Sequence, residues 1–297
     1  MALRNRTMEE LWRFKFSSGD RISYAPALSG DRVYVISTDC LIWSLDLKHG
    51  FFYFKEPLAS RMMRAVLPER GAVKNFLFRN GLVYIHLKDL FGRSHSLIFD
   101  PEKISLVKGD PAHLVRKVVY IFKNRVRIER CMIDGRFREG VRAVDHTDDS
   151  FLWNSSERIR PAIKYTEVVG DVMQAGEGII IAQNYFSRRR KMPAGYSITS
   201  YHYRRGEVLW NMESFTYSSR LYSFTTAGDF MYITTGALGG NKEGFLIKIN
   251  LKKGNIVEKI PFMEINSGVS GGGPGMEGLF FLGAGDTVIA LEDKPDK

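Results

Sequence analysis

The chain has 297 residues, of which 44% are apolar and 26% charged, and it carries a formal charge of +10. This apolar fraction excludes an intrinsically disordered protein, and no apolar run approaches the roughly 18 residues that cross a bilayer, so membrane insertion is not expected. The two cysteines, Cys40 and Cys131, exclude a disulfide framework and a cysteine-based zinc site. We expect both to be small core residues.

Between Met1 and the acidic pair Glu9 and Glu10, the sequence has no apolar stretch of the kind found in a secretory signal. We therefore expect a cytoplasmic protein. Glutamine occurs only at Gln174 and Gln183, which together with the high charge content is in keeping with a thermophilic source.

Short strands rich in β-branched and aromatic residues recur along the chain, and glycine turns separate them. The first copy has strands within residues 25–37 and 41–50, followed by the aromatic run Phe51 to Phe54. In successive copies, the turn between the first two strands falls at Gly30, Gly81, Asn124, Gly178, Gly228 and Gly278. The mean step is about 50 residues, so the repeat accounts for the whole chain.

A repeat of about 50 residues with four short antiparallel strands is typical of a propeller blade. We predict an all-β, single-domain β-propeller over residues 1–297, with six four-stranded blades within a range of roughly five to seven. The last copy lacks a fourth strand, whereas residues 10–16 resemble the fourth strands of other copies, so the N-terminal strand is expected to complete the last blade. The blades are expected at about 23–55, 74–108, 117–155, 168–212, 222–259 and 266–292 plus 10–16.

These copies resemble the repeat of the PQQ-like, or quinoprotein-alcohol-dehydrogenase-like, propellers. The first copy carries the pattern at Pro26, Gly30, Val33, Tyr34, Val35, Leu45, Asp46 and Gly50, with Phe54 in place of the closing tryptophan. The resemblance implies the fold more than the activity, and about six blades departs from the eight that are common in the family. Quinone-dependent members are expected to carry an adjacent cysteine pair and a calcium site, which cannot be placed here, so we expect no cofactor and no metal. We expect Trp12, Trp153 and Trp210 to pack between blades.

Three histidines are candidates for a catalytic or metal-binding site. His86 ends the second strand of the second copy, His95 begins its third strand, and His113 precedes the third copy, so all three could approach one rim of the ring. Asp89 or Asp110 would supply a carboxylate. This arrangement would suit a propeller-type enzyme, a hydrolase or a lyase. The alternative is three partly exposed rim histidines, and we favour a protein without catalytic residues.

Basic residues gather in the segments that a blade meander places on one rim, at residues 55–73, 88–94, 156–167 and 184–195. The last segment contains four consecutive basic residues between aromatic ones. The third copy adds further basic residues whose alternation predicts a solvated, basic strand face, namely Arg116, Lys117, Lys123, Arg125, Arg127, Arg130, Arg136 and Arg138. The expected partner-binding residues are Arg61, Arg64, Arg93, Arg158, Arg160, Arg188, Arg189, Arg190, Lys191, Tyr185 and Phe186.

A basic rim with aromatic side chains suits phosphates and unpaired bases, and it equally suits an acidic protein surface. The alternative interpretation is a set of solvated loops. We predict a non-catalytic β-propeller binding scaffold whose basic rim engages a protein partner or complex, with nucleic acid as the second class of partner.

Overall fold

The computed structural model describes the strands of the chain and most of their shorter turns. The described residues are 8–17, 21–22, 25–37, 41–57, 73–79, 82–88, 91, 94–107, 119–123, 125–132, 138–155, 165–186, 193–214, 219–237, 243–263, 265–271 and 278–294. Within these ranges the protein is all-β, as predicted, and no helix is long and apolar enough to cross a membrane.

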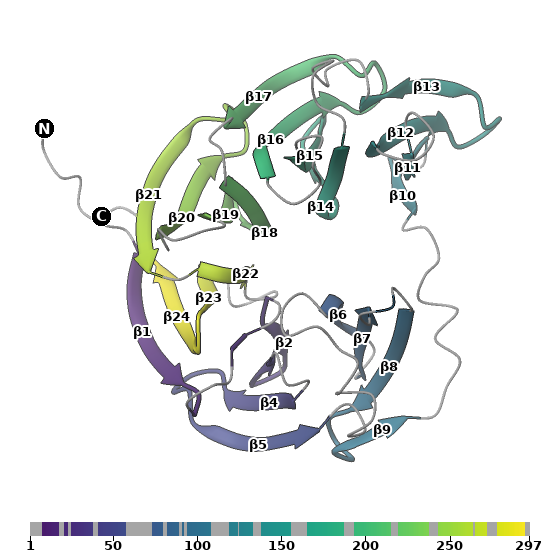
Figure 1. Cartoon of the computed structure of the whole chain (residues 1–297). Coiled ribbons are helices and arrows are strands. Elements are labelled where there is room, and N and C mark those ends of the chain that lie inside the picture. Colours follow the sequence, from purple (N-terminus) through teal and green to yellow (C-terminus); the bar gives the residue numbers. More distant parts are fainter. Residues whose placement is uncertain are drawn as a thin grey trace, which may run out of the picture. The chain divides into compact units, whose positions relative to one another are not determined.

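The described strands form six four-stranded sheets (Figure 1). In the first five, four consecutive strands are hydrogen-bonded in chain order. Sheet I comprises β2 (Ala27–Ser29), β3 (Arg32–Ile36), β4 (Leu41–Asp46) and β5 (Phe52–Pro57). Sheet II comprises β6 (Val73–Arg79), β7 (Leu82–Lys88), β8 (Ser94–Asp100) and β9 (Ser105–Val107). Sheet III comprises β10 (Val119–Phe122), β11 (Val126–Met132), β12 (Glu139–Asp145) and β13 (Phe151–Asn154).

The remaining sheets repeat this plan with longer strands. Sheet IV comprises β14 (Tyr165–Ala175), β15 (Gly178–Phe186), β16 (Pro193–His202) and β17 (Val208–Ser214). Sheet V comprises β18 (Ser219–Ala227), β19 (Phe230–Ala237), β20 (Glu243–Asn250) and β21 (Ile256–Met263). Sheet VI comprises β22 (Ile265–Gly271), β23 (Leu279–Ala284), β24 (Thr287–Asp293) and, from the other end of the chain, β1 (Met8–Lys15).

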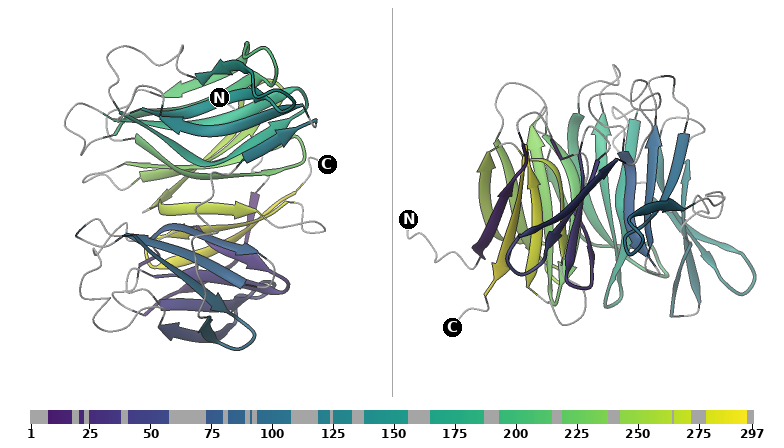
Figure 2. Two further views of the ribbon diagram at one scale, coloured as in Figure 1. Left: turned by 90° about the vertical axis from the view of Figure 1, so that its right-hand side faces the viewer. Right: turned by 90° about the horizontal axis from the view of Figure 1, so that it is seen from below.

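The first strand of the chain completes the last sheet. β1 runs antiparallel to β24, with Met8 opposite Asp293 and Lys15 opposite Thr287, and Figure 2 shows the two strands side by side in purple and yellow. Phe16 extends the pairing by donating its amide N–H to the carbonyl of Asp286 at 2.8 Å. The prediction that the N-terminal strand supplies the missing fourth strand is therefore confirmed.

The chain divides into two compact units, each with its own apolar core. Unit 1 contains residues 1–114, 223–228 and 262–297, and unit 2 contains residues 115–222 and 229–261. In unit 1, Val33, Val35 and Leu45 of sheet I pack with Phe281 and Val288 of sheet VI. In unit 2, the core joins sheets III and IV through Val126, Ile128, Val141, Ile179 and Ile181. Apolar side chains on facing sheets thus fill the space between neighbours within each unit.

A tight turn of one kind joins the third and fourth strands of sheets I to V. The residue that ends the third strand accepts backbone N–H groups from within the turn; for example, Asn250 Oδ1 accepts from Lys252 and Lys253 at 3.0 Å each. Four residues after that acceptor the backbone has positive φ. The residues in this position are Gly50, Ile104, Asp149, Gly206 and Gly254.

A β-bulge precedes each tryptophan of the fourth strands. In four sheets, the residue immediately before the aromatic one has no opposite residue on the neighbouring strand. This residue is Leu11 in sheet VI, Tyr53 in sheet I, Leu152 in sheet III and Leu209 in sheet IV. A bulge adds one residue to one strand and re-aims the side chain that follows. The bulge therefore leaves the extra residue unpaired and redirects Trp12, Phe54, Trp153 or Trp210.

Each redirected tryptophan reaches the third-to-fourth strand turn of the neighbouring sheet within its own unit. The indole N–H donates to the carbonyl of the residue that follows the third strand of that sheet. The pairs are Trp12 with Leu47 at 3.0 Å, Trp153 with Tyr203 at 2.9 Å, and Trp210 with Leu251 at 2.8 Å. The three tryptophans therefore lie between sheets, as the sequence predicted.

The indole ring also covers the positive-φ glycine of the same turn. At Gly206, where φ is +69°, an added Cβ would lie 2.6 Å from Cγ of Trp153. Gly50 and Gly254 meet Trp12 and Trp210 in the same way. Glycine is required at these positions for its conformation and for the space that the ring occupies.

Replacing Gly206 with alanine tests this contact, and Gly228 is a matched control with φ of +55° and open space around its Cα. The positive φ costs either variant about 1–2 kcal/mol. We expect Gly206→Ala to lose about 1–3 kcal/mol more in the free energy of unfolding, because the methyl group overpacks the indole. Urea unfolding followed by tryptophan fluorescence measures both. Equal losses would show that the ring does not constrain the turn.

Candidate functional site

Most of the predicted partner-binding residues lie outside the described residues. These are Arg61, Arg64, Arg93, Arg158, Arg160, Arg188, Arg189, Arg190 and Lys191. The two aromatic residues of the prediction, Tyr185 and Phe186, end β15 and are described. Tyr185 is buried, and its hydroxyl donates to Ser197 Oγ at 2.6 Å, so the ring is held inside sheet IV and is not offered to a partner. Phe186 is half-buried.

The register of sheet II separates two of the three candidate histidines. His86 pairs with Ser96, and His95 pairs with Leu87. Because paired residues of antiparallel strands share a face and neighbouring residues alternate, His86 and His95 lie on opposite faces of the sheet. His113 lies outside the described residues. The two described histidines therefore do not converge on one point.

Among the described residues, no group of three or more His, Cys, Asp or Glu side chains is placed to hold a metal ion. Cys131 is half-buried on β11, and Cys40 lies outside the described residues.

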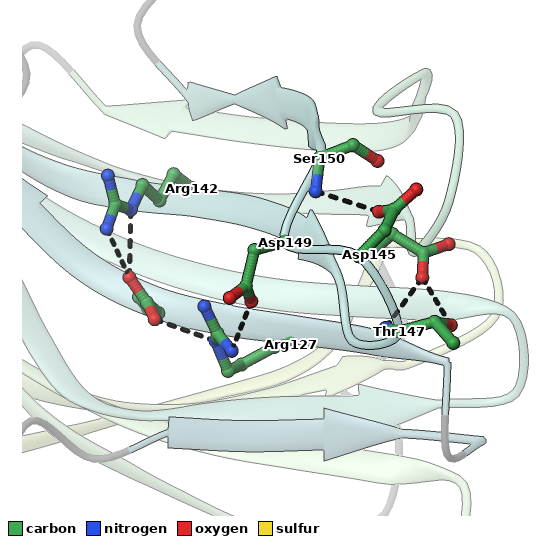
Figure 3. A network of polar contacts seen from close by, with 8 residues as sticks. Arg127, Arg142, Asp145, Thr147, Asp149 and Ser150 are labelled. Carbon is green, nitrogen blue, oxygen red and sulfur yellow. Dashed lines mark hydrogen bonds and ion pairs between the residues drawn. The ribbon is translucent and has the colours of Figure 1, made fainter.

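An ion-pair network crosses one face of sheet III, in place of the basic face that the alternating arginines predict (Figure 3). The buried carboxylate of Glu129 accepts from Arg127 Nε at 2.8 Å, and from Arg142 Nε and Nη2 at 2.8 and 2.7 Å. Arg127 also pairs with Asp149 at 2.7 Å, and Figure 3 shows both groups pointing toward each other. The two arginines are thus balanced by two carboxylates, one of which is buried.

The arginines change the acidity of Glu129. Hydrogen bonding from Arg142, reinforced by its charge and by Arg127, lowers the pKa of the Glu129 carboxyl below its ordinary value, although burial acts in the opposite direction. In the nearby turn, the Thr147 hydroxyl and amide N–H both donate to Asp145 Oδ1 and lower the pKa of Asp145. Both groups stay ionised at neutral pH and act as structural acceptors.

A second set of charged side chains, which we call the β14 arginine cluster, surrounds the beginning of β14. Its members are Arg130 of β11, Arg220 of β18, and the carboxylates Glu139 and Glu167. Arg130 Nη2 donates to the carbonyl of Val168 at 2.6 Å, and Arg220 Nη2 to Glu167 Oε2 at 3.3 Å. The backbone of Arg138 bridges to Thr166. The sequence did not predict this cluster, because Arg130 and Arg220 belong to strands of two different sheets.

Buried amides fix β14 and β15 to their neighbours in unit 2. Asn184 is fully buried; its Nδ2 donates to the carbonyl of Leu221, and its Oδ1 accepts the amide N–H of Leu221, both at 2.9 Å. Gln183 Nε2 donates to the carbonyl of Glu139 at 3.0 Å. These bonds satisfy the buried amides and hold the arginine cluster on a fixed frame.

Charge is distributed unevenly between the described strands and the rest of the chain. The described residues include 24 Lys and Arg side chains and 23 Asp and Glu side chains, which nearly cancel. The remaining 19 basic and 10 acidic residues belong to the segments outside them, most of which join one strand to the next. Nearly all of the net charge of +10 is therefore carried by residues outside the described ones.

Fold and site together define an all-β protein of repeated four-stranded sheets, with near-neutral strands and basic connecting segments. No family model matches the chain, and comparison with curated protein sequences finds no match. Among solved structures, the chain is similar to the crystal structure of BamB from Moraxella catarrhalis, with 11% sequence identity and a TM-score of 0.41, over 98% of this chain and 99% of that one. This likeness establishes neither a shared family nor a shared activity.

Glu129→Gln tests the buried ion pair through pH. Because the folded-state pKa of Glu129 is lowered from 4.5, its contribution to stability is fully present above about pH 4.5 and is lost as the pH falls through the folded value. We expect the variant to be less stable than the wild type by about 2 kcal/mol at pH 7, and the difference to close as the pH falls through the lowered pKa of folded Glu129. Urea unfolding at several pH values measures it. The exposed Glu207→Gln is the control, and a difference that does not vary with pH would contradict the assignment.

Proposed function

We propose that the chain is a single propeller domain of the PQQ-like kind, closed by the pairing of β1 with β24, and that it works as a non-catalytic binding scaffold. Six consecutive four-stranded sheets support this architecture, and so do tryptophan contacts that recur from sheet to sheet. A rigid frame that carries many connecting segments suits binding, because the frame positions side chains on loops at little entropic cost.

The uneven distribution of the net positive charge along the chain is the observation that supports this function. The sheets are close to neutral, whereas the segments outside the described residues hold 19 basic against 10 acidic side chains. A concentration of Lys and Arg away from the frame attracts an acidic partner and speeds its encounter. We propose that these segments, with Arg188, Arg189, Arg190 and Lys191 as their densest run, engage a partner protein.

The enzyme alternative is less well supported. A catalytic rim needs the histidines to converge, and the register of sheet II puts His86 and His95 on opposite faces. For a nucleic-acid partner, the aromatic ring proposed to stack on bases, Tyr185, is buried and hydrogen-bonded. A protein partner remains the better supported class.

Replacing Arg188, Arg189, Arg190 and Lys191 together with glutamine tests the proposal. We expect affinity purification from the native cell at moderate salt to recover a partner protein with the wild type and to lose it with the variant, because four positive charges are removed from one segment. Capture should also weaken steeply with salt.

Nuclease treatment and a charge-matched control complete this experiment. Replacing Arg204, Arg205, Lys252 and Lys253 with glutamine removes the same charge from exposed turns of sheets IV and V. Loss of the partner on nuclease treatment would point to nucleic acid. Equal loss with both variants, or capture that ignores both, would contradict a binding role for the tetrabasic segment.

A further inference from the structure

The turn between β16 and β17 of sheet IV contains a histidine at a position where the corresponding turns contain an aspartate or an asparagine. The residue that ends the third strand is Asp46 in sheet I, Asp100 in sheet II, Asp145 in sheet III and Asn250 in sheet V. Each of these side chains accepts at least one backbone N–H of its turn through Oδ1. In sheet IV the residue is His202, so an imidazole nitrogen takes the place of the oxygen acceptor.

The hydrogen bonds of this turn determine which ring nitrogen of His202 carries the proton. Nδ1 lies 3.3 Å from the backbone nitrogens of both Arg204 and Arg205. A backbone N–H only donates, so Nδ1 has to accept, and the ring is neutral with its proton on Nε2. Carboxylate and amide oxygens stay acceptors between about pH 5 and 8, whereas imidazoles take up a second proton in this range. Among the described turns of sheets I to V, this one therefore has the acceptor that a change of pH near neutrality removes.

The charged groups around His202 come from the neighbouring turns of unit 2. On the Nε2 side, Oε2 of Glu177 in the β14–β15 turn lies 3.9 Å away, which is too long for a hydrogen bond. The other oxygen of Glu177 is bonded to Lys123 of the β10–β11 turn, and this bond is the main cause that lowers the pKa of Glu177. The other charged or titratable side chains of the β16–β17 turn and of the β12–β13 turn are Arg204, Arg205, Glu207, Asp145, His146, Asp148 and Asp149.

The attraction between Glu177 and a protonated His202 is weak. The Glu177 side chain is 54% exposed, and Lys123 already occupies one of its oxygens. On the other side of the ring, a proton on Nδ1 would face two backbone N–H groups, and both hydrogen bonds would be lost. The direct loss at Nδ1 therefore outweighs the gain at Nε2.

The same turn supports the tryptophan contact between sheets III and IV. Tyr203, next to His202, has the carbonyl that accepts the indole N–H of Trp153 at 2.9 Å, and the indole ring covers Gly206. The turn closes through the backbone of His202, whose N–H donates to Glu207 at 2.7 Å and whose carbonyl accepts from Gly206 at 2.9 Å. Opening the turn on the Nδ1 side therefore displaces both groups that Trp153 contacts.

We propose that His202 is a pH-sensitive switch at the junction between sheets III and IV. When the ring is neutral, Nδ1 holds the turn and Trp153 stays bonded to Tyr203. When the ring is protonated, the turn opens and the contact of Trp153 weakens. The closed turn excludes a proton that the open turn accepts, so opening becomes more favourable as the pH falls. The switch acts inside unit 2 and does not depend on which partner the scaffold binds.

Hydrogen exchange of the indole N–H groups, followed by NMR between about pH 8 and pH 5, tests the switch. Trp210 is the internal reference, because it makes the same contact within unit 2 to a turn whose acceptor is Asn250. The intrinsic exchange of both indoles depends on pH in the same way, so the ratio of their rates reports the junctions. We expect the rate of Trp153 relative to Trp210 to rise about tenfold from the higher to the lower pH, because the lost bonds favour local opening.

His202→Asn is the variant without a titrating group, because asparagine serves as the acceptor at the corresponding position of sheet V. We expect its ratio of Trp153 to Trp210 exchange to stay within about twofold over the same pH range. His146→Asn is the matched control, which removes an exposed histidine from the β12–β13 turn and should keep the wild-type rise. A wild-type ratio that does not rise, or an equal rise in His202→Asn, would overturn the switch.

A measurement on the wild type alone keeps the proposal testable if His202→Asn folds poorly. Long-range ¹H–¹⁵N correlation spectra of the histidine rings distinguish a nitrogen that carries a proton from one that does not. At about pH 8 we expect Nε2 of His202 to carry the proton and Nδ1 to carry none. A proton on Nδ1 at this pH would contradict the hydrogen bonds on which the switch depends.

Discussion

The contact between a tryptophan of one sheet and a glycine turn of the next is the interaction on which the rest of this structure depends. A single four-stranded sheet of about 40 residues cannot bury both of its faces, so it is stable only against a neighbour. The tryptophan supplies a large apolar ring, and its N–H ties the ring to one carbonyl of the neighbouring turn, as Trp153 does to Tyr203. The contact therefore fixes the position of one sheet against the next as well as adding buried area.

Three local features have to agree for this contact to form. The bulge redirects the indole, the turn presents a carbonyl, and the position that the ring covers has no side chain, as at Gly206. Sheet II differs from this pattern, because its turn has Ile104 and not glycine at the positive-φ position. The aromatic residue that sheet I places against sheet II is Phe54, whose ring centroid lies 6.1 Å from that of Phe99. At this junction a smaller ring without an N–H donor thus occurs together with a turn whose positive-φ residue has a side chain.

Much of the architecture could be predicted from the sequence, because local signals specify it. The spacing of turns, the strand composition and the likeness of residues 10–16 to Phe151–Asn154 indicate four-stranded sheets and the pairing of β1 with β24. The bulges are only weakly indicated in the sequence, by an apolar residue immediately before the aromatic one, as in Leu152-Trp153. Register is set by long-range pairing, which a single sequence does not reveal.

The charged sites were harder to predict for the same reason. The alternating basic residues of the third copy predict a basic face, but Glu129 lies on β11 and pairs with Arg142 of β12. The position of Arg142 depends on the register of these two strands. Arg220 reaches Glu167 from 53 residues away. The uneven division of charge between the described strands and the rest of the chain is a property of composition, and it follows from the sequence once these strands are known.

Hydrogen exchange of the four tryptophan indole N–H groups, followed by NMR, tests the central claim most directly, because three of them should be bonded to neighbouring sheets. We predict that the indole protons of Trp12, Trp153 and Trp210 exchange slowly, and that Gly206→Ala accelerates exchange at Trp153 while leaving Trp12 unchanged. Trp43, a buried indole N–H without an acceptor among the described residues, provides the reference for burial alone. Rapid exchange at all three joining tryptophans, or no response of Trp153 to the variant, would contradict the claim.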